Sequence, residues 1–66
     1  MKVNVNLEKI KTYINDKNLS KGEFCKLCDI SYHAFYNILN RKNYSFQTLF
    51  KISRVLNTYM LELLTD

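Results

Sequence analysis

Residues 19–31 of the chain read Leu19-Ser20-Lys21-Gly22-Glu23-Phe24-Cys25-Lys26-Leu27-Cys28-Asp29-Ile30-Ser31. Ser20 followed three residues later by Glu23 is the pattern of a capping box, in which two residues satisfy each other's free backbone amides at a helix start. Four apolar residues then recur at helical spacing and form the stripe of a short helix over residues 21–28. They are Phe24, Cys25, Leu27 and Cys28.

A second helix is expected directly after this one. Asp29 tolerates the backbone geometry of a turn, and Ser31 is a strong N-cap for a helix over residues 32–40. The connection between the two helices is therefore only about three residues long. So short a link is typical of a helix-turn-helix unit, which we place at about residues 20–40.

Helical patterns continue on both sides of this unit. Asn6 and Ser45 are each followed by apolar residues at helical spacing, as expected for N-caps. Asn57 suits a left-handed C-cap at the end of the later helix. Residues 2–6 alternate between polar and apolar side chains and indicate a short extended arm over residues 1–6. The further helices are expected from residue 7 to an end at residues 16–18, at residues 46–56 and at residues 59–64.

Composition favours an all-α fold. The chain has 66 residues, enough for one domain with one core, and it contains one Gly and no Pro. A sheet protein of this size needs many tight turns, which draw on both residue types. We therefore predict a single all-α domain of five short helices over residues 1–66. Its predicted core is Ile10, Phe24, Cys28, Ile30, Phe35, Ile38, Leu49, Ile52 and Leu56.

Positive charge is concentrated in the second half of the chain. The formal net charge is +4, and residues 30–61 carry no carboxylate. A helical surface in water usually mixes both signs, so a one-signed region suggests an anionic partner, most commonly nucleic acid. Chance in a mildly basic protein is the alternative explanation. The four basic residues of this segment are Arg41, Lys42, Lys51 and Arg54.

The helix at residues 32–40 separates into two faces. Its inner arc holds Ala34, Phe35, Ile38 and Leu39, and its outer arc holds Tyr32, His33, Tyr36, Asn37 and Asn40. Exposed helix faces are usually rich in Lys and Glu, but the outer arc carries aromatic and hydrogen-bonding groups instead. Such groups suit the edges of bases and the methyl group of thymine. Arg41 and Lys42 follow at once and are well placed for phosphates.

These stretches resemble the Cro/CI-type (XRE-type) helix-turn-helix domains of phage repressors. Residues 19–31 are similar to the family pattern LSQEELAEKLGVS, and residues 45–52 are similar to SLETLLKI. Residues 37–42 resemble the end of the recognition helix and its loop. With two short words near the C-terminus, the match spans roughly residues 7–64.

The resemblance implies a lambda-repressor-like fold whose third helix lies in the major groove of duplex DNA. It implies a sequence-specific transcriptional regulator, a Cro-like repressor of phage or bacterial type, that binds its operator as a homodimer. Carried over by position, the base-contacting residues are Tyr32, His33, Tyr36 and Asn37. The phosphate-contacting residues are Lys21, Asn40, Arg41, Lys42 and Asn43.

The chain departs from the family pattern at three kinds of position. Asp29 and Arg41 stand where the family has glycine, at positions that can require a left-handed backbone. Ile14 and Leu39 stand where many members pair an Arg with a Glu, so an apolar contact is expected there. The usual Gln and Arg base readers are missing, which leaves the DNA sequence read by this chain open.

The C-terminal segment is a candidate dimer interface. A single recognition helix makes a small DNA contact, and Cro-like proteins compensate by binding as two-fold dimers. Met60 and Leu63 can turn inward together, whereas Tyr59 and Leu61 cannot share that direction. Those two side chains either complete the core or form a patch that self-associates. We assign the dimer interface to Tyr59, Leu61 and Leu64.

Cys25 and Cys28 form a CxxC pair, which also occurs in zinc and redox sites. A zinc site needs four ligands, and His33 is the only other soft candidate. A redox pair needs a strand that leads into the helix start. We therefore expect two buried structural thiols and no metal. We also expect no cofactor, no small-molecule ligand and no enzymatic activity. His33 either contacts DNA or is solvated, and Lys51 and Arg54 are expected to be solvated.

A second function stays open, namely a helix-turn-helix domain used for protein contact, such as an antirepressor or an inhibitor of another regulator. Tyr32 and Tyr36 support it because tyrosine is enriched at protein interfaces. The carboxylate-free segment favours DNA. No apolar run approaches the ~18 residues of a membrane span, and residues 1–4 lack the apolar core of a signal peptide. We therefore expect a cytoplasmic protein without a membrane partner.

Overall fold

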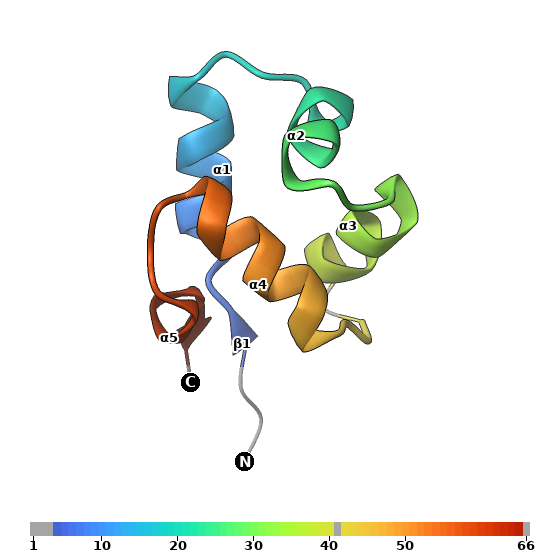
Figure 1. Cartoon of the computed structure of the whole chain (residues 1–66), viewed down its shortest axis with the longest axis vertical. Helices are drawn as coiled ribbons and strands as arrows, with labels where there is room; N and C mark the ends of the chain where they lie inside the picture. The colour runs from blue at the N-terminus through green and yellow to red at the C-terminus, as the bar shows by residue number, and fades with distance from the viewer. Residues whose placement is uncertain (1–3, 41, 66) are drawn as a thin grey trace.

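The computed structural model describes residues 4–40 and 42–65. Within them five helices follow one another, and a short strand lies at each end (Figure 1). The order is β1 (Asn4–Val5), α1 (Leu7–Asp16), α2 (Lys21–Cys28), α3 (Tyr32–Leu39), α4 (Phe46–Val55), α5 (Met60–Leu63) and β2 (Leu64–Thr65). The predicted all-α class with five helices is confirmed.

The first four helices begin at the predicted polar caps. The side-chain oxygens of Asn6, Ser20, Ser31 and Ser45 each accept a hydrogen bond from the backbone amide three residues later. The capping box is complete, because the Ser20 amide also donates to Glu23 Oε1 at 2.8 Å. This hydrogen bond from the backbone of Ser20 lowers the pKa of Glu23. The helix starts are thus set by local sequence.

Among residues 4–40 and 42–65, three that are not glycine adopt the left-handed backbone conformation. Asn18 follows α1, Asp29 ends α2 with φ 58° and ψ 48°, and Asn57 follows α4 with φ 55°. The predicted turn at Asp29 and the predicted left-handed cap at Asn57 are therefore confirmed. Asn and Asp tolerate this conformation because their short side chains can hydrogen-bond locally. The corresponding expectation for Arg41 lies outside the described residues.

The turn between α2 and α3 is held by a residue from α4. Lys51 Nζ donates to the carbonyl oxygen of Asp29 at 3.1 Å and lies 3.7 Å from its carboxylate oxygen Oδ2. The Ile30 amide donates to the Cys25 carbonyl at 3.1 Å, and this hydrogen bond closes the turn. Lys51 is half-buried, so its expected role as a merely solvated side chain is wrong. The pairing joins residues 22 positions apart, which no local pattern reveals.

The core lies between the helices and contains most of the predicted residues. Ile30 and Leu56 are half-buried and pack against it, so they line the core instead of forming its centre. Leu27 was expected in the apolar stripe of α2 but is 55% exposed, because its three partners already fill the inward arc. The buried hydrophobic residues among those described are Val5, Ile10, Phe24, Cys25, Cys28, Phe35, Ile38, Leu49, Ile52 and Leu63.

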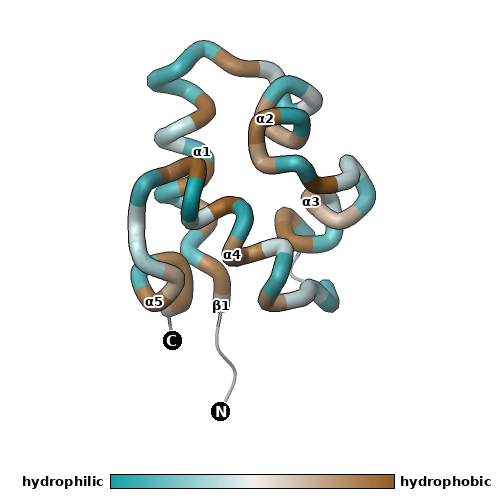
Figure 2. Tube along the Cα trace, in the orientation of Figure 1, coloured by the Kyte–Doolittle hydropathy of each residue, from teal (hydrophilic) through white to brown (hydrophobic). Residues whose placement is uncertain are grey.

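The outer side of α4 carries two large apolar side chains. Phe46 and Phe50 are both largely exposed, whereas Leu49 and Ile52 are enclosed. The helix can bury only one stripe, and Leu49 and Ile52 occupy it. Figure 2 shows the resulting mixture of apolar and polar residues along α4.

The extended segment near the N-terminus is part of the domain. Val5 pairs with Leu64 in an antiparallel β1–β2 ladder, and the Asn6 amide donates to the Leu63 carbonyl at 2.6 Å. The side chain of Val5 is buried. The predicted extended conformation is therefore confirmed for Asn4–Val5, but this stretch is anchored to the end of α5. Residues 1–3 of the expected arm lie outside the described residues.

Cys25 and Cys28 are free, buried thiols, as expected for structural cysteines. Burial, together with the neighbouring Cys25, raises the pKa of Cys28 to about 12. Burial also raises the pKa of Cys25. Both groups stay protonated near neutral pH, and it is the thiolate that reacts or binds metal. Within residues 4–40 and 42–65, no group of three His, Cys, Asp or Glu side chains could hold a metal ion.

Replacement of Phe35 by alanine tests this core. Phe35 is fully enclosed and its ring centroid lies 5.3 Å from that of Phe24, so Phe35→Ala is expected to cost about 3–5 kcal/mol of unfolding free energy. The exposed neighbour Tyr36 provides the matched control, and Tyr36→Ala should change stability by at most about 0.5 kcal/mol. Urea denaturation followed by circular dichroism measures both. Equal stability of Phe35→Ala and wild type would contradict the core assignment.

Candidate nucleic-acid interface

The exposed side of α3 is the centre of the candidate site. Phe35 and Ile38 are buried, and Ala34 and Leu39 are half-buried, as the helical periodicity predicted. The opposite side is presented to solvent, with only Asn37 half-buried. We call this opposite side the reading face. It consists of Tyr32, His33, Tyr36, Asn37 and Asn40.

The reading face offers hydrogen-bonding groups of several kinds. Asn40 Nδ2 donates to the carbonyl oxygen of Tyr36 at 2.9 Å, which fixes this amide at the C-terminal end of α3. The side-chain amide of Asn37 makes no hydrogen bond within the described residues, so both its donor and its acceptor are available. A free Asn amide can bond two atoms of an adenine edge at once. The face therefore has the chemistry needed to read bases.

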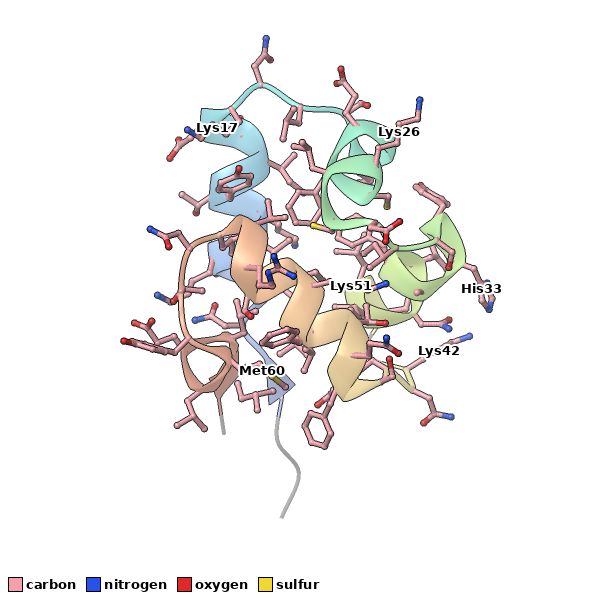
Figure 3. All side chains as sticks on the ribbon, in the orientation of Figure 1. Lys17, Lys26, His33, Lys42, Lys51 and Met60 are labelled. Carbon is pink, nitrogen blue, oxygen red and sulfur yellow. The ribbon has the colours of Figure 1, made fainter. Side chains whose placement is uncertain are left out.

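The predicted phosphate-contacting residues that the structure describes are exposed. Lys21 is the exposed first residue of α2, and Lys42 and Asn43 are exposed in the segment after α3. The Lys42 amide donates to the Asn37 carbonyl at 2.8 Å, which ties the start of this segment to the helix. Figure 3 shows His33 and Lys42 extending from the same side of the molecule. The predicted phosphate contact at Arg41 lies outside the described residues.

The acidic groups near this region are already engaged. Asp29 precedes α3, and its carboxylate lies 3.7 Å from Lys51 Nζ. Glu23 accepts the hydrogen bond that closes the capping box of α2. From Ile30 to Leu61 the sequence holds no carboxylate. The segment that contains α3 therefore carries basic side chains and no acidic ones, which favours an anionic partner.

The side chains of the C-terminal segment fall into a buried and an exposed group, as their spacing predicted. Leu63 is fully buried and Met60 half-buried, whereas Tyr59 is 80% and Leu61 81% exposed. Tyr59 and Leu61 therefore do not complete the core of the single chain. Leu64 is half-buried, and its backbone belongs to the β1–β2 ladder. In Figure 3, Met60 of this segment lies far from His33 and Lys42.

Two features around the helix-turn-helix unit were not predicted from the sequence. One is Lys51, whose contact with the turn fixes α4 against the helix-turn-helix unit. The other is a hollow between α1, α2 and α3 that brings Lys21 close to Leu39 of α3. Both depend on packing between distant segments. Periodicity and capping signals report only neighbours in the chain.

The comparison with protein families agrees with this geometry. A family model described as a Cro/C1-type HTH DNA-binding domain matches residues 9–66. A search of curated proteins and a search of solved structures gave no match. In the described residues, no helix is long and apolar enough to cross a bilayer. The family match includes α2, the turn and the whole reading face, and the chain belongs to the Cro/C1-type helix-turn-helix DNA-binding family.

Proposed function

We propose that the chain is a sequence-specific regulator of transcription, a Cro-like repressor that inserts α3 into the major groove of its operator. The observation that carries this proposal is the reading face, which has aromatic and amide groups, no carboxylate and Lys42 in the segment that follows it. The major groove is wide enough for an α-helix, and each base pair presents a distinct pattern of donors and acceptors there. Such a regulator acts in the cytoplasm, where bacterial DNA is found.

Each residue type has a separate task in this proposal. Asn37 reads an adenine edge, and His33, Tyr32 and Tyr36 contact neighbouring bases or thymine methyl groups. The flanking residues position the helix by binding phosphates and displacing counterions, which gives affinity without sequence information. The proposed phosphate contacts are Lys21, Asn40, Arg41, Lys42 and Asn43. Repression follows when the occupied operator excludes other proteins.

One observation favours a second candidate function. Tyr32 and Tyr36 are each about half exposed on a face that contains no Arg or Gln. Tyrosine-rich faces of this kind also occur at protein interfaces, where the domain would inhibit another regulator. A mobility-shift experiment with genomic fragments separates the two functions. Specific, salt-dependent retardation supports the repressor, and the absence of retardation for every fragment supports protein contact.

We further propose that the regulator binds DNA as a homodimer through a patch of Tyr59, Leu61 and Leu64. Two of these side chains are about four-fifths exposed, so they offer apolar surface that a second copy of the chain would cover. Dimerisation doubles a DNA contact that is small for one domain, at roughly 600–1,000 Å². It also matches a two-fold protein to a palindromic site.

Salt dependence tests the phosphate contacts. Affinity for duplex DNA should fall linearly on a log–log plot against salt concentration, with a slope of about 0.9 for each phosphate neutralised. Lys42→Ala should weaken all DNA sequences alike and reduce the slope by about 0.9 per protomer. Lys17→Ala, which removes a cation from the distant end of α1, should leave the slope unchanged (Figure 3). Identical slopes for Lys42→Ala and wild type would remove Lys42 from the interface.

Base preference tests the role of Asn37. Asn37→Ala should flatten selectivity at one base pair, at a cost of roughly 1–3 kcal/mol for the preferred base. Asn43→Ala removes the same side-chain amide from a proposed phosphate contact, so it should weaken every sequence equally. Selection from a randomised DNA library measures both variants. Unchanged preference at all positions in Asn37→Ala would exclude Asn37 as a base reader.

Sedimentation at micromolar concentration tests the dimer. Leu61→Asp places a charge in the exposed patch and should shift the protein toward monomer while the fold is retained. Leu27→Asp is the matched control, because Leu27 is an exposed leucine on α2 outside the patch. It should leave the association unchanged. A strict monomer in the wild type, with DNA binding intact in Leu61→Asp, would refute the proposed interface.

A further inference from the structure

A hollow of about 380 Å³ lies between α1, the start of α2 and the inner edge of α3. Its apolar lining comes from Ile14, Leu19 and Leu39, all half-buried, with the enclosed Phe35 behind them. A volume of this size falls in the range of small-molecule sites. No residue of the reading face lines it, so the hollow is a separate feature of the surface.

The polar part of the lining consists of four residues that can all donate hydrogen bonds. They are Lys11, Asn15, Asn18 and Lys21. Within the described residues, none of these side chains forms a hydrogen bond or an ion pair. Among the residues that the structure describes, no carboxylate lines the hollow. Two free ammonium groups and two free amides therefore stand beside an apolar surface.

We propose that this hollow binds an amphipathic organic anion, a carboxylate attached to an aliphatic chain. The chain would cover the half-buried Ile14, Leu19 and Leu39, and apolar burial favours that contact. The carboxylate would accept charge-assisted hydrogen bonds from Lys11 and Lys21. A bare inorganic anion would leave the apolar lining in water, and a neutral apolar molecule would leave both ammonium groups unused.

The position of Lys21 couples this site to DNA. Lys21 lines the hollow, and in the proposed function it also contacts a phosphate of the operator. A carboxylate bound to Lys21 therefore competes with that phosphate, and the ligand lowers DNA affinity. This step rests on the proposed function, whereas ligand binding itself does not.

The first experiment measures ligand binding without DNA. Decanoate, below its micelle-forming concentration, is titrated into the full chain while methyl resonances are followed by NMR, and circular dichroism confirms that the protein stays folded. Acetate supplies the same charge without the chain, and decanol supplies the chain without the charge. We expect decanoate to shift the methyl resonances of Ile14, Leu19 and Leu39 at concentrations at which acetate and decanol leave them unchanged.

Two lysine variants on the same helix sharpen this experiment. Lys11→Gln removes one cation of the hollow and should weaken decanoate binding about threefold to fivefold, as expected for a partly exposed ion pair. Lys9→Gln removes an equally exposed cation that does not line the hollow, so it should have no effect. Equal affinity for decanol and decanoate, or shifts centred on Tyr59 and Leu61, would overturn the proposed site.

The second experiment adds DNA. Saturating decanoate should reduce operator affinity relative to acetate at the same concentration, and Lys11→Gln should need more decanoate for the same reduction. Unchanged DNA affinity with the hollow saturated would overturn the competition. If decanoate binds the hollow but no DNA fragment binds the protein, the site stands and only the repressor proposal fails.

Discussion

The contact between two buried phenyl rings holds the helix-turn-helix unit together. Phe24 of α2 and Phe35 of α3 are both fully enclosed, and their ring centroids lie 5.3 Å apart at a tilt of 52°. Tyr13 extends the cluster to α1, with its centroid 5.9 Å from that of Phe24. Tilted aromatic pairs at this separation are favourable beyond the apolar area they bury. The three helices around the candidate site therefore converge on one aromatic cluster.

Packing of Phe35 also determines what α3 shows to solvent. A helix has one rotational setting at which Phe35 and Ile38 are both inside, and at that setting Tyr32, His33 and Tyr36 are outside. A rotation of the helix by about 100°, the angle between successive residues, would bury polar groups and expose core residues. The base-reading chemistry proposed for α3 thus depends on the interior of the domain as well as on its surface residues.

Features set by neighbouring residues could be predicted from the sequence, and features set by distant residues could not. The capping box at Ser20 and Glu23 and the left-handed turn at Asp29 are local, and the structure contains them as predicted. The Lys51–Asp29 contact joins two helices, and the pairing of Val5 with Leu64 joins the two ends of the domain. The sequence indicates neither contact, because several other lysines or apolar residues could have made it.

The same distinction applies to the candidate site. Periodicity was sufficient to place Tyr32, His33 and Tyr36 on one exposed face, because a helix repeats regularly. It could not show that Lys21 of α2 lies near Leu39 of α3, since their proximity depends on how α1, α2 and α3 pack. Periodicity does not identify the molecule that the exposed face binds. We infer that molecule from the chemical groups on the face and from the family to which the chain belongs.

The arrangement of the helices keeps the proposed DNA-reading face apart from the proposed dimer interface. In Figure 1, α3 and α5 lie near opposite ends of α4, so a contact made through α5 leaves the reading face uncovered. A two-fold axis through the patch of Tyr59, Leu61 and Leu64 would place the α3 helices on the outer sides of the dimer. In the proposed dimer, the contact through α5 would set the spacing between the two reading faces, whereas the residues of α3 would set the sequence that is read.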